Sequence, residues 1–295
     1  RDHGSYCKRP EFFHRRRTCR RRLNINREKI PAPDPGLLKH ITMNKSVLMT
    51  QKDGIAQIIL SRPERLNAIN DDLLTELNAA LKSVNEDSDV GVVILRGAGK
   101  AFCAGDDLKD AANRRDMPEV EIRRYLEDIQ EITRLMMLNE KVVIGAIHGW
   151  AAGGGFEWAL NCDFTIMAES ARCFFPEVGL GIFVTGGISS ILPNLVGLQK
   201  AKELIILGEK VDAKTALELG IAWKVVPDES LLDEAYDLAK RLMAMPHTAR
   251  GLAKKTLNLS ASLPLSDAMD LETSVTTEGM LDPDTAARAA AALAK

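Results

Sequence analysis

Apolar and polar residues follow two different periods along the chain from Val47 onward. Runs of five or six mostly apolar residues are typical of strands that are buried on both faces of a sheet. Apolar residues spaced three or four positions apart predict amphipathic helices between these runs. The expected strands cover residues 55–60, 90–95, 142–147 and 164–168, and the expected helices start at Asp71 or Asp72, near residue 118 and inside the glycine run 153–155.

After Gly187 the pattern becomes mostly helical, with one short expected strand at residues 222–226. Strands and helices that first alternate and then give way to a run of helices predict an α/β fold with a helical C-terminal region. The expected helical segments are 188–195, 198–207, 213–220, 230–244, 247–260, 265–280 and 283–294.

Charge divides the chain into two unequal parts. Residues 1–42 contain 12 Lys and Arg against 4 Asp and Glu, whereas the remaining residues contain 27 against 37. We expect the basic segment to be disordered. It is interpreted as sequence upstream of a start at Met43 or Met49, as a mitochondrial presequence, or as a basic RNA-binding arm. The acidic remainder argues against nucleic acid as its main partner, and no apolar run of about 18 residues predicts a membrane span.

The five cysteines form no CxxC pair and no spacing with histidine that is typical of a metal site. An odd number of cysteines without such a framework is typical of a reducing compartment. We therefore expect no metal, and a cytoplasmic location, or a mitochondrial one if residues 1–42 are a presequence. Cys162 and Cys173 are interpreted as small hydrophobic residues of the core. The full set is Cys7, Cys19, Cys103, Cys162 and Cys173.

Two loops that follow expected strands are rich in small residues. The first, residues 100–109, contains Ala104-Gly105-Asp106-Asp107, and the second, residues 149–157, contains Gly153-Gly154-Gly155. Small residues let a ligand approach the backbone closely, and free N–H groups at the start of a helix can receive negative charge. The second loop is neither a Walker A loop nor a GxGxxG fingerprint, because the residues that define both are missing. Each loop by itself is also compatible with an ordinary turn.

The order and spacing of the motifs resemble the crotonase family, also called the enoyl-CoA hydratase/isomerase superfamily, over residues 47–295. The resemblance implies the crotonase fold, a spiral of ββα repeats with a helical C-terminal region. We expect the spiral core over residues 43–240 and a helical oligomerisation region over 241–295, with assembly into a homotrimer or a dimer of trimers. The motifs are Arg62-Pro63-Glu64-Arg65-Leu66-Asn67-Ala68-Ile69, Ala101-Phe102-Cys103-Ala104-Gly105-x-Asp107, Ala146-Ile147-His148-Gly149, Gly153-Gly154-Gly155, Cys162-Asp163 and Phe175-Pro176-Glu177-Val178-Gly179-Leu180-Gly181.

The resemblance also implies how an acyl-CoA substrate is bound. By motif position, the backbone N–H groups of Asp106 and Gly154 form the oxyanion hole for the thioester carbonyl. The carbonyl of Ala104 matches the position that holds the adenine amino group of coenzyme A. Lys109 matches a position near the phosphates of coenzyme A, and is otherwise a solvated surface lysine. Asp107 is expected to tie down the loop, and no cofactor is expected beyond the coenzyme A of the substrate.

Two glutamates carry the expected chemistry. In the hydratases of the family, the positions that match Glu157 and Glu177 are both Glu, and these side chains exchange protons with a water and the enoyl thioester. Two close carboxylates have separated pKa values, which lets one act as the base and the other as the acid. The simpler interpretations are a first-turn helix acid for Glu157 and a surface acid for Glu177. Isomerases of the family usually keep only the acid that matches Glu177. The sequence departs from the usual hydratase pattern at residues 181–187, at Asp106 and at Trp158. These departures put a straight-chain acyl group in doubt as part of the substrate.

These features lead to three hypotheses. The first is an acyl-CoA lyase that adds water to a 2-enoyl-CoA with Glu157 and Glu177. The second is an enoyl-CoA isomerase that uses Glu177 alone. The third is a non-catalytic binding protein on the same scaffold.

Overall fold

The computed structural model describes residues 39–43, 46–114 and 116–293, and residues 1–38 of the expected basic segment lie outside this part. The division of the chain that we expected at residue 43 stays a prediction. Strand β1 (Lys39–Met43) pairs antiparallel with β2 (Val47–Lys52), so the sheet already begins at Lys39. β3 occupies one edge of β2, and β1 pairs with the backbone groups of the other edge, which would otherwise lack hydrogen-bond partners in the sheet.

The main sheet has seven strands in the order β1-β2-β3-β4-β5-β7-β10. The first three strands are antiparallel, and β3 to β10 run parallel to one another. Side chains of β4 alternate between two core clusters, one on each face of the sheet. This explains why the central strands are continuous apolar runs. The remaining bounds are β3 (Ile55–Leu60), β4 (Val92–Gly97), β5 (Val142–Ile147), β7 (Phe164–Ala168) and β10 (Lys224–Val226).

A second sheet joins three short strands in the order β6-β8-β9. They are β6 (Trp150–Ala152), β8 (Arg172–Phe174) and β9 (Val211–Asp212). The sequence pattern did not predict them, because a period cannot be recognised in two or three residues. The second sheet matters for the site, since β6 leads directly into the glycine run.

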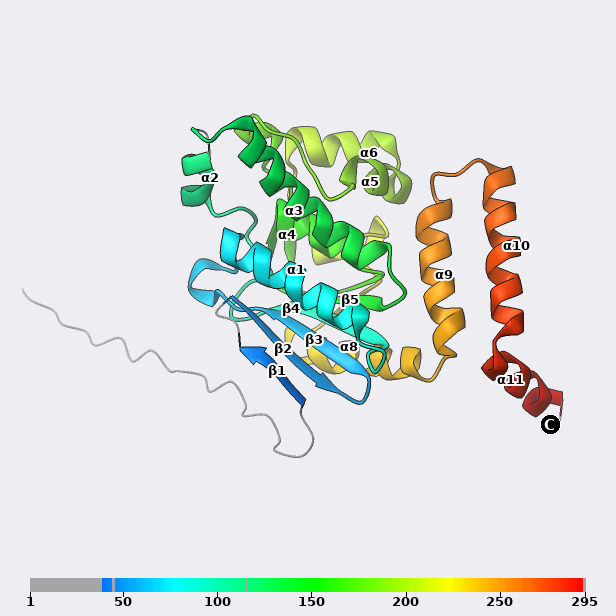
Figure 1. Cartoon of the computed structure of the whole chain (residues 1–295). Helices are drawn as coiled ribbons and strands as arrows, with labels where there is room; N and C mark the ends of the chain where they lie inside the picture. The colour runs from blue at the N-terminus through cyan, green and yellow to red at the C-terminus, as the bar shows by residue number, and fades with distance from the viewer. Residues whose placement is uncertain (1–38, 44–45, 115, 294–295) are drawn as a thin grey trace, which may run out of the picture. The chain divides into compact units, whose positions relative to one another are not determined.

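Helices cover both faces of the main sheet (Figure 1). α1 (Asp71–Glu86) and α3 (Glu119–Met137) pack side by side on one face, and α8 (Leu231–Met243) packs on the other. The cap of α1 corrects our prediction: Asn70, rather than Asp71 or Asp72, accepts a hydrogen bond from the Leu73 N–H at 3.0 Å. Asn70 has extended backbone angles, as an N-cap requires, while both aspartates already lie inside the first turn.

The other long helices follow the predicted order, whereas the helix at Leu108–Arg114 was not predicted. The expected segment 198–207 divides into an α-helical and a π-helical part. Among the described residues, no helix has the length and apolar character that crossing a membrane requires. The helices are η1 (Pro63–Arg65), α2 (Leu108–Arg114), α4 (Gly154–Leu160), η2 (Val178–Leu180), α5 (Ile188–Val196), α6 (Leu198–Lys202), η3 (Glu203–Leu207), α7 (Ala213–Glu218), η4 (Asp228–Ser230), α9 (His247–Ser260), α10 (Leu265–Leu281) and α11 (Pro283–Leu293).

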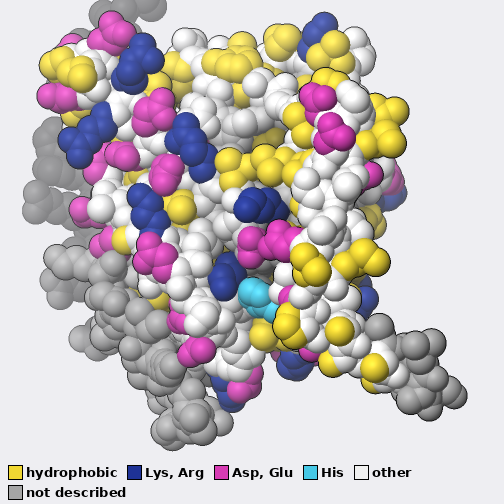
Figure 2. All heavy atoms as spheres, turned by 45° about the vertical axis from the view of Figure 1, so that its right-hand side comes forward, with side chains coloured by type: hydrophobic (Ala, Val, Ile, Leu, Met, Phe, Trp, Pro, Cys, Tyr) yellow, Lys and Arg dark blue, Asp and Glu magenta, His cyan; other side chains and the backbone are white. Residues whose placement is uncertain are grey.

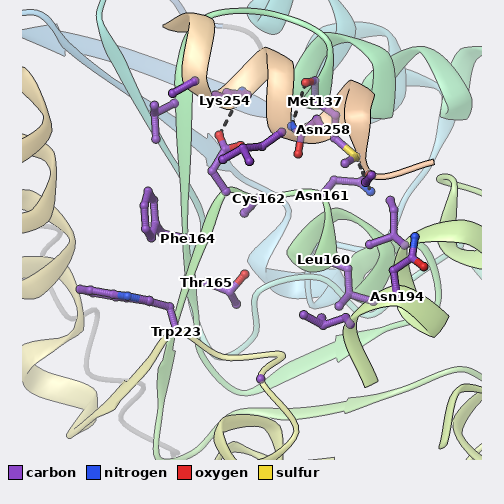
Figure 3. Close-up of a pocket in the computed structure, with 18 of the residues that line it drawn as sticks. Met137, Leu160, Asn161, Cys162, Phe164, Thr165, Asn194, Trp223, Lys254 and Asn258 are labelled. Carbon is purple, nitrogen blue, oxygen red and sulfur yellow. Dashed lines mark hydrogen bonds and ion pairs between the residues drawn. The ribbon is translucent and has the colours of Figure 1, made fainter. Parts of the chain in front are cut away.

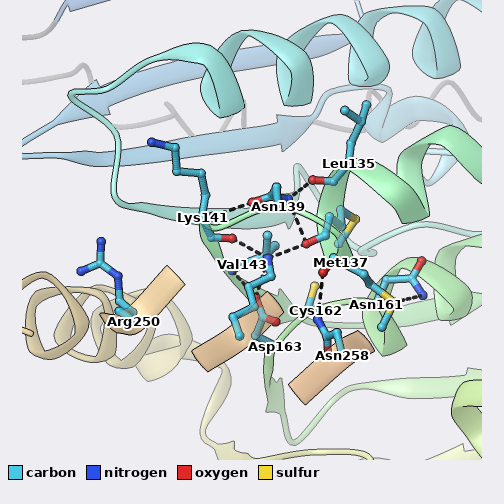
Figure 4. A network of polar contacts seen from close by, with 12 residues as sticks. Leu135, Met137, Asn139, Lys141, Val143, Asn161, Cys162, Asp163, Arg250 and Asn258 are labelled. Atoms are coloured by element: carbon cyan, nitrogen blue, oxygen red, sulfur yellow. Dashed lines mark hydrogen bonds and ion pairs between the residues drawn. The ribbon is translucent and has the colours of Figure 1, made fainter. Parts of the chain in front are cut away.

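Buried polar contacts attach α9 to the rest of the fold (Figure 4). The Lys254 ammonium lies 3.0 Å from the Asp163 carboxylate, and both side chains are largely buried. It also donates to the carbonyls of Met136 and Lys141. Farther along α9, the Asn258 side chain donates to the Met137 carbonyl at 3.0 Å. These contacts satisfy buried groups that would otherwise destabilise the fold.

Candidate functional site

The loop after β4 is held between two segments that are distant in the sequence. On one side, the Ile69 N–H donates to the Gly105 carbonyl at 2.8 Å. On the other side, the Cys103 N–H donates to the Trp150 carbonyl, and the Cys103 carbonyl accepts from the Ala152 N–H, both at 3.0 Å. The first glycine-bearing loop therefore lies directly against β6, which carries the second one.

Glycine is required where these two loops meet. Gly105 has φ +85°, and a β-carbon there would lie 2.7 Å from the Ala152 carbonyl oxygen. Gly153 has φ +51°, and a β-carbon there would lie 2.5 Å from Oε1 of Glu177. Larger residues are strained at such angles and would collide with these atoms. The glycines thus bring the two loops and one carboxylate into contact.

The N–H groups of Asp106 and Gly154 have no hydrogen-bond partner in the part of the chain that the structure describes. Asp106 forms a parallel bridge with Ile69. The hydrogen bonds of this bridge join Ile69 to the residues on either side of Asp106, namely Gly105 and Asp107. The N–H of Asp106 consequently points away from Ile69. Gly154 is the first residue of α4, where N–H groups have no partner within the helix. Both are the residues that the motifs predict as oxyanion donors.

The Asp106 side chain is tied into a polar cluster. Its carboxylate accepts from the Tyr125 hydroxyl at 2.6 Å and from Arg114 at 3.1 Å to both oxygens. Arg114 also lies over the Tyr125 ring, at 3.6 Å from its centre, and contacts Asp71 at 3.0 Å. Burial raises the pKa of Asp106, while the hydrogen bond from Tyr125 and the charge of Arg114 lower it.

The three other residues named for this loop differ in their surroundings. Asp107 forms an ion pair with Arg62 at 3.3 Å and accepts from the Lys109 N–H, which agrees with a role in holding the loop. The half-buried Ala104 donates its N–H to the Leu66 carbonyl at 3.0 Å. The Lys109 side chain is exposed on α2.

Glu157 lies on α4 and is only 2% exposed. Both of its carboxylate oxygens accept hydrogen bonds from Thr185: Oε1 from the backbone N–H at 2.7 Å, and Oε2 from the hydroxyl at 2.6 Å. Burial raises the pKa of Glu157, and the two bonds from Thr185 act in the opposite direction because they stabilise the ionised form. Glu157 does lie in the first turn of α4, as the simpler interpretation expected, but its side chain is buried.

Glu177 precedes η2 and is 8% exposed, so it is not a surface acid. Its Oε2 is buried and has no hydrogen-bond partner among the described residues. Burial, together with the charges of Glu157 and Asp106, raises the pKa of Glu177 to about 7. The structure therefore brings Glu157, Glu177 and Asp106 close enough for their charges to interact.

Several contacts of the site were not predicted from the sequence. Thr185 lies in the segment 181–187 that was noted only as a departure from the family pattern, and Arg114 and Tyr125 were not singled out. In contrast, Trp158 is fully buried in the core, so its ring is not positioned to line an accessible acyl site. Its adjacency to Glu157 in the sequence was misleading, because successive residues of a helix point in different directions.

Two cavities flank these residues without containing the predicted oxyanion donors or the glutamates. One of about 280 Å³ runs along α3 and reaches Thr185. The other, of about 730 Å³, lies between α9 and the end of α4 (Figure 3). Residues that face this second cavity include Asn161, Phe164, Asn194, Trp223, Lys254 and Asn258.

The chain is similar to known proteins over most of its length. The family model described as enoyl-CoA hydratase/isomerase matches residues 50–285. The chain is 35% identical to a crotonyl-CoA hydratase of Syntrophomonas wolfei over 77% of this chain and 87% of that protein. It is also 35% identical to a 1,2-epoxyphenylacetyl-CoA isomerase of Escherichia coli over 78% of this chain and 88% of that protein.

A solved structure extends this similarity to the fold. The enoyl-CoA hydratase of Bacillus anthracis superposes with a TM-score of 0.76 at 34% identity, and the match covers 81% of this chain and 92% of that one. The expected crotonase fold is thereby confirmed. With the family model, the relatives and the fold in agreement, the chain belongs to the enoyl-CoA hydratase/isomerase family of enzymes.

Proposed function

We propose that this protein is an acyl-CoA lyase that adds water across the double bond of a 2-enoyl-CoA thioester. One observation carries the proposal: two buried glutamates with different hydrogen-bond environments interact beside two backbone N–H groups that have no partner among the described residues. An isolated buried carboxylate is costly to keep in a fold. Two such groups next to unpaired donors support a catalytic role for the cluster.

The N–H groups of Asp106 and Gly154 act on the thioester carbonyl. When a nucleophile adds to the β-carbon, negative charge moves onto the thioester oxygen, and two donors fixed in advance stabilise it. The open carbonyl of Ala104 and the exposed Lys109 are proposed to bind the adenine and the phosphates of coenzyme A. No further cofactor takes part in this scheme.

The hydrogen bonds of the two glutamates assign their roles. Two donors from Thr185 favour the ionised form of Glu157, so it acts as the base that removes a proton from water. Glu177 has a pKa of about 7 and holds the proton that it donates to the α-carbon. Water thus contributes a hydroxyl to the β-carbon and a proton to Glu157. Glu157 then releases its proton and Glu177 takes one up, which restores both groups and completes the cycle.

The test is an assay of the full chain against straight-chain, branched and aromatic 2-enoyl-CoA thioesters, followed by the loss of absorbance of the conjugated thioester. Glu157→Gln and Glu177→Gln should each lower kcat by about 100- to 10,000-fold, the usual contribution of a positioned acid or base. Glu169→Gln, which changes an exposed glutamate, serves as the control. Absence of hydration with every thioester would refute the proposal and favour a non-catalytic binding protein.

A second candidate, an enoyl-CoA isomerase that uses Glu177 alone, has one observation in its favour. Both oxygens of Glu157 are already occupied by Thr185, whereas Oε2 of Glu177 has no partner among the described residues. In this case Glu157→Gln should keep most of the isomerisation of a 3-enoyl-CoA, while Glu177→Gln should abolish it. Comparing the two variants in both assays separates the candidates.

The acyl group is the least determined part of the substrate. The segment Gly181–Gly187 and the tied carboxylate of Asp106 border the site, and both depart from the family pattern. We propose that the preferred acyl group is branched or aromatic rather than a short straight chain. The ratio of kcat/KM values across the same panel measures this preference.

The thiols support the proposed cytoplasmic location. Cys103 and Cys173 are buried, Cys162 is half-buried, and all three are free. Burial raises the pKa of Cys103 and of Cys173 to about 12, which makes them inert core residues instead of redox groups. A mitochondrial location remains the alternative, to be tested by following a fluorescent fusion with and without residues 1–42.

A further inference from the structure

Thr185 contacts Glu157 in a way that uses both its backbone and its side chain. The hydroxyl donates its proton to Oε2 at 2.6 Å, and the N–H donates to Oε1 at 2.7 Å. Any residue except proline offers the N–H, but only serine or threonine could offer the hydroxyl from the same position. The hydroxyl bond is therefore a property of this residue type, separate from the shape of the loop.

The loop around Thr185 is itself held against Glu157. The Gly186 carbonyl accepts from the Asn161 side chain at 2.9 Å, and Asn161 in turn accepts from the Thr133 hydroxyl at 2.8 Å. Gly186 has φ +58°, and a β-carbon there would lie 2.9 Å from Oε2 of Glu157. These contacts leave the Thr185 hydroxyl little freedom to turn away. Thr185 also lines the cavity along α3, so it stands between Glu157 and a space that a ligand can enter.

The charged groups near Glu157 and Glu177 determine how much the hydrogen bond from the Thr185 hydroxyl matters for ionisation. Glu177 faces Glu157 from the start of η2, and Asp106 acts on Glu177 from the loop after β4. From α2 and α3, Arg114 and Tyr125 contact Asp106. Three neighbouring carboxylates cannot all ionise freely, and each hydrogen-bond donor favours the ionised form of the carboxylate that it contacts. Two donors bind Glu157, while none reaches Oε2 of Glu177 in the described chain.

We infer that the Thr185 hydroxyl acts as a positioning group: it orients Glu157 and stabilises the ionised form of its carboxylate. The inference deepens the proposed hydration and rests on it for its kinetic part. Thr185 exchanges no proton with the substrate. It acts through Glu157, and its loss weakens the base while the oxyanion donors and the coenzyme A contacts remain.

The kinetic test compares Thr185→Val, which removes the hydroxyl at nearly constant volume, with Thr185→Ser, which restores it. A hydrogen bond to a charged group is strong enough that Thr185→Val should lower kcat by about 10- to 100-fold. KM should change by less than about threefold, since ground-state binding is retained. Without the hydroxyl the pKa of Glu157 rises, so the acid side of the kcat profile should move to higher pH. Thr185→Ser should recover most of the activity.

A direct measurement keeps the inference independent of turnover. The protonation of Glu157 in the ligand-free chain is followed by infrared spectroscopy of the carboxyl groups over a pH series, with Glu157→Gln to assign the signal. We expect the midpoint for Glu157 to be higher in Thr185→Val than in the unchanged chain or in Thr185→Ser. Thr185→Ala is the second variant if the valine perturbs the loop, and thermal unfolding confirms that each variant is folded.

Two results would overturn the inference. One is an unchanged Glu157 midpoint in folded Thr185→Val and Thr185→Ala. The other is a Thr185→Ser variant as impaired as Thr185→Val, because the shape of the residue and not its hydroxyl would then matter. A chain that hydrates no enoyl-CoA but shows the shifted midpoint would refute the proposed function and leave the role of Thr185 intact.

Discussion

The carboxyl group of Glu177, whose Oε2 has no hydrogen-bond partner among the described residues, has a consequence for stability as well as for chemistry. Its pKa is about 7 in the folded chain, against an ordinary value of 4.5. Between these values the unfolded chain releases the proton while the folded chain retains it. The folded chain therefore loses stability as the pH rises from 4.5 through 7. Glutamine resembles the protonated form and carries no such cost.

Glu177→Gln should accordingly stabilise the protein at high pH. We expect a gain of about 1–3 kcal/mol in the free energy of unfolding near pH 8, and almost none near pH 4, where glutamate is protonated in both states. Urea unfolding of both chains at these two values measures the difference. A gain of equal size at both pH values would show that packing, and not the charge of Glu177, is responsible.

The oxyanion donors can be tested at Gly154 with a matched pair of variants. Gly154→Pro removes the N–H at the first position of α4, where proline is well tolerated. Gly154→Ala adds a β-carbon but keeps the N–H, and that carbon meets only the end of the Ile69 side chain, at 2.8 Å. We expect the proline variant to have a kcat about 100- to 1,000-fold below that of the alanine variant. Similar rates in the two folded variants would exclude this N–H as a donor.

The sequence predicts the residues that belong to motifs and misses the partners that the fold supplies. Glu157, Glu177, Asp106 and Gly154 were found by their positions within family motifs. Thr185 was not, because it contacts Glu157 across 28 positions of the chain and no local pattern encodes that distance. Its only signal was that the segment 181–187 departed from the family pattern.

At the scale of elements, the attachment of α9 depends on a buried ion pair. Burial raises the pKa of Asp163 and lowers that of Lys254, and their mutual attraction opposes both shifts. Lys254→Met leaves the Asp163 charge buried without its partner, which should cost about 3–5 kcal/mol of the free energy of unfolding. Lys255→Met, which changes an exposed neighbour, should cost less than about 0.5 kcal/mol.

A double variant separates the charge from the packing of α9. Asn at position 163 keeps an oxygen that can accept the Val143 N–H and carries no charge. Lys254→Met with Asp163→Asn should therefore be more stable than Lys254→Met alone in urea unfolding. If the second change brings no recovery, the loss arises from the Met136 and Lys141 carbonyls that Lys254 also contacts.

Long helices and strands were predicted more accurately than short ones. The long helices and the central strands were predicted to within a few residues, because several turns or a full buried run reveal the period. β6, β8 and β9 were missed, as their two or three residues are defined only by pairing with distant segments. The order of the strands in the main sheet is likewise a result of tertiary contacts, and no sequence period encodes it.

At the scale of the whole molecule, α10 presents apolar side chains that the described part of the chain leaves exposed. Leu265, Met269 and Met280 recur on one side of the helix and are 78%, 56% and 74% exposed. Another side of α10 packs against α9. Hydrophobic side chains are visible on the surface of these C-terminal helices, which come forward on the right in Figure 2. Exposed apolar side chains that recur on one side of a helix favour contact with another subunit.

We therefore expect α10 to bury this surface in the proposed trimer or dimer of trimers. Met269→Glu with Met280→Glu places charge on the apolar side and should shift the mass measured by light scattering toward the monomer. Ser274→Glu adds one negative charge on a different side of α10 and should leave the mass unchanged. The far-ultraviolet circular dichroism of all three chains should agree, because α10 contributes no buried residue to the core of its own chain. An unchanged assembly in the double variant would mean that a different surface joins the subunits, and the exposed side of α10 would then need another explanation.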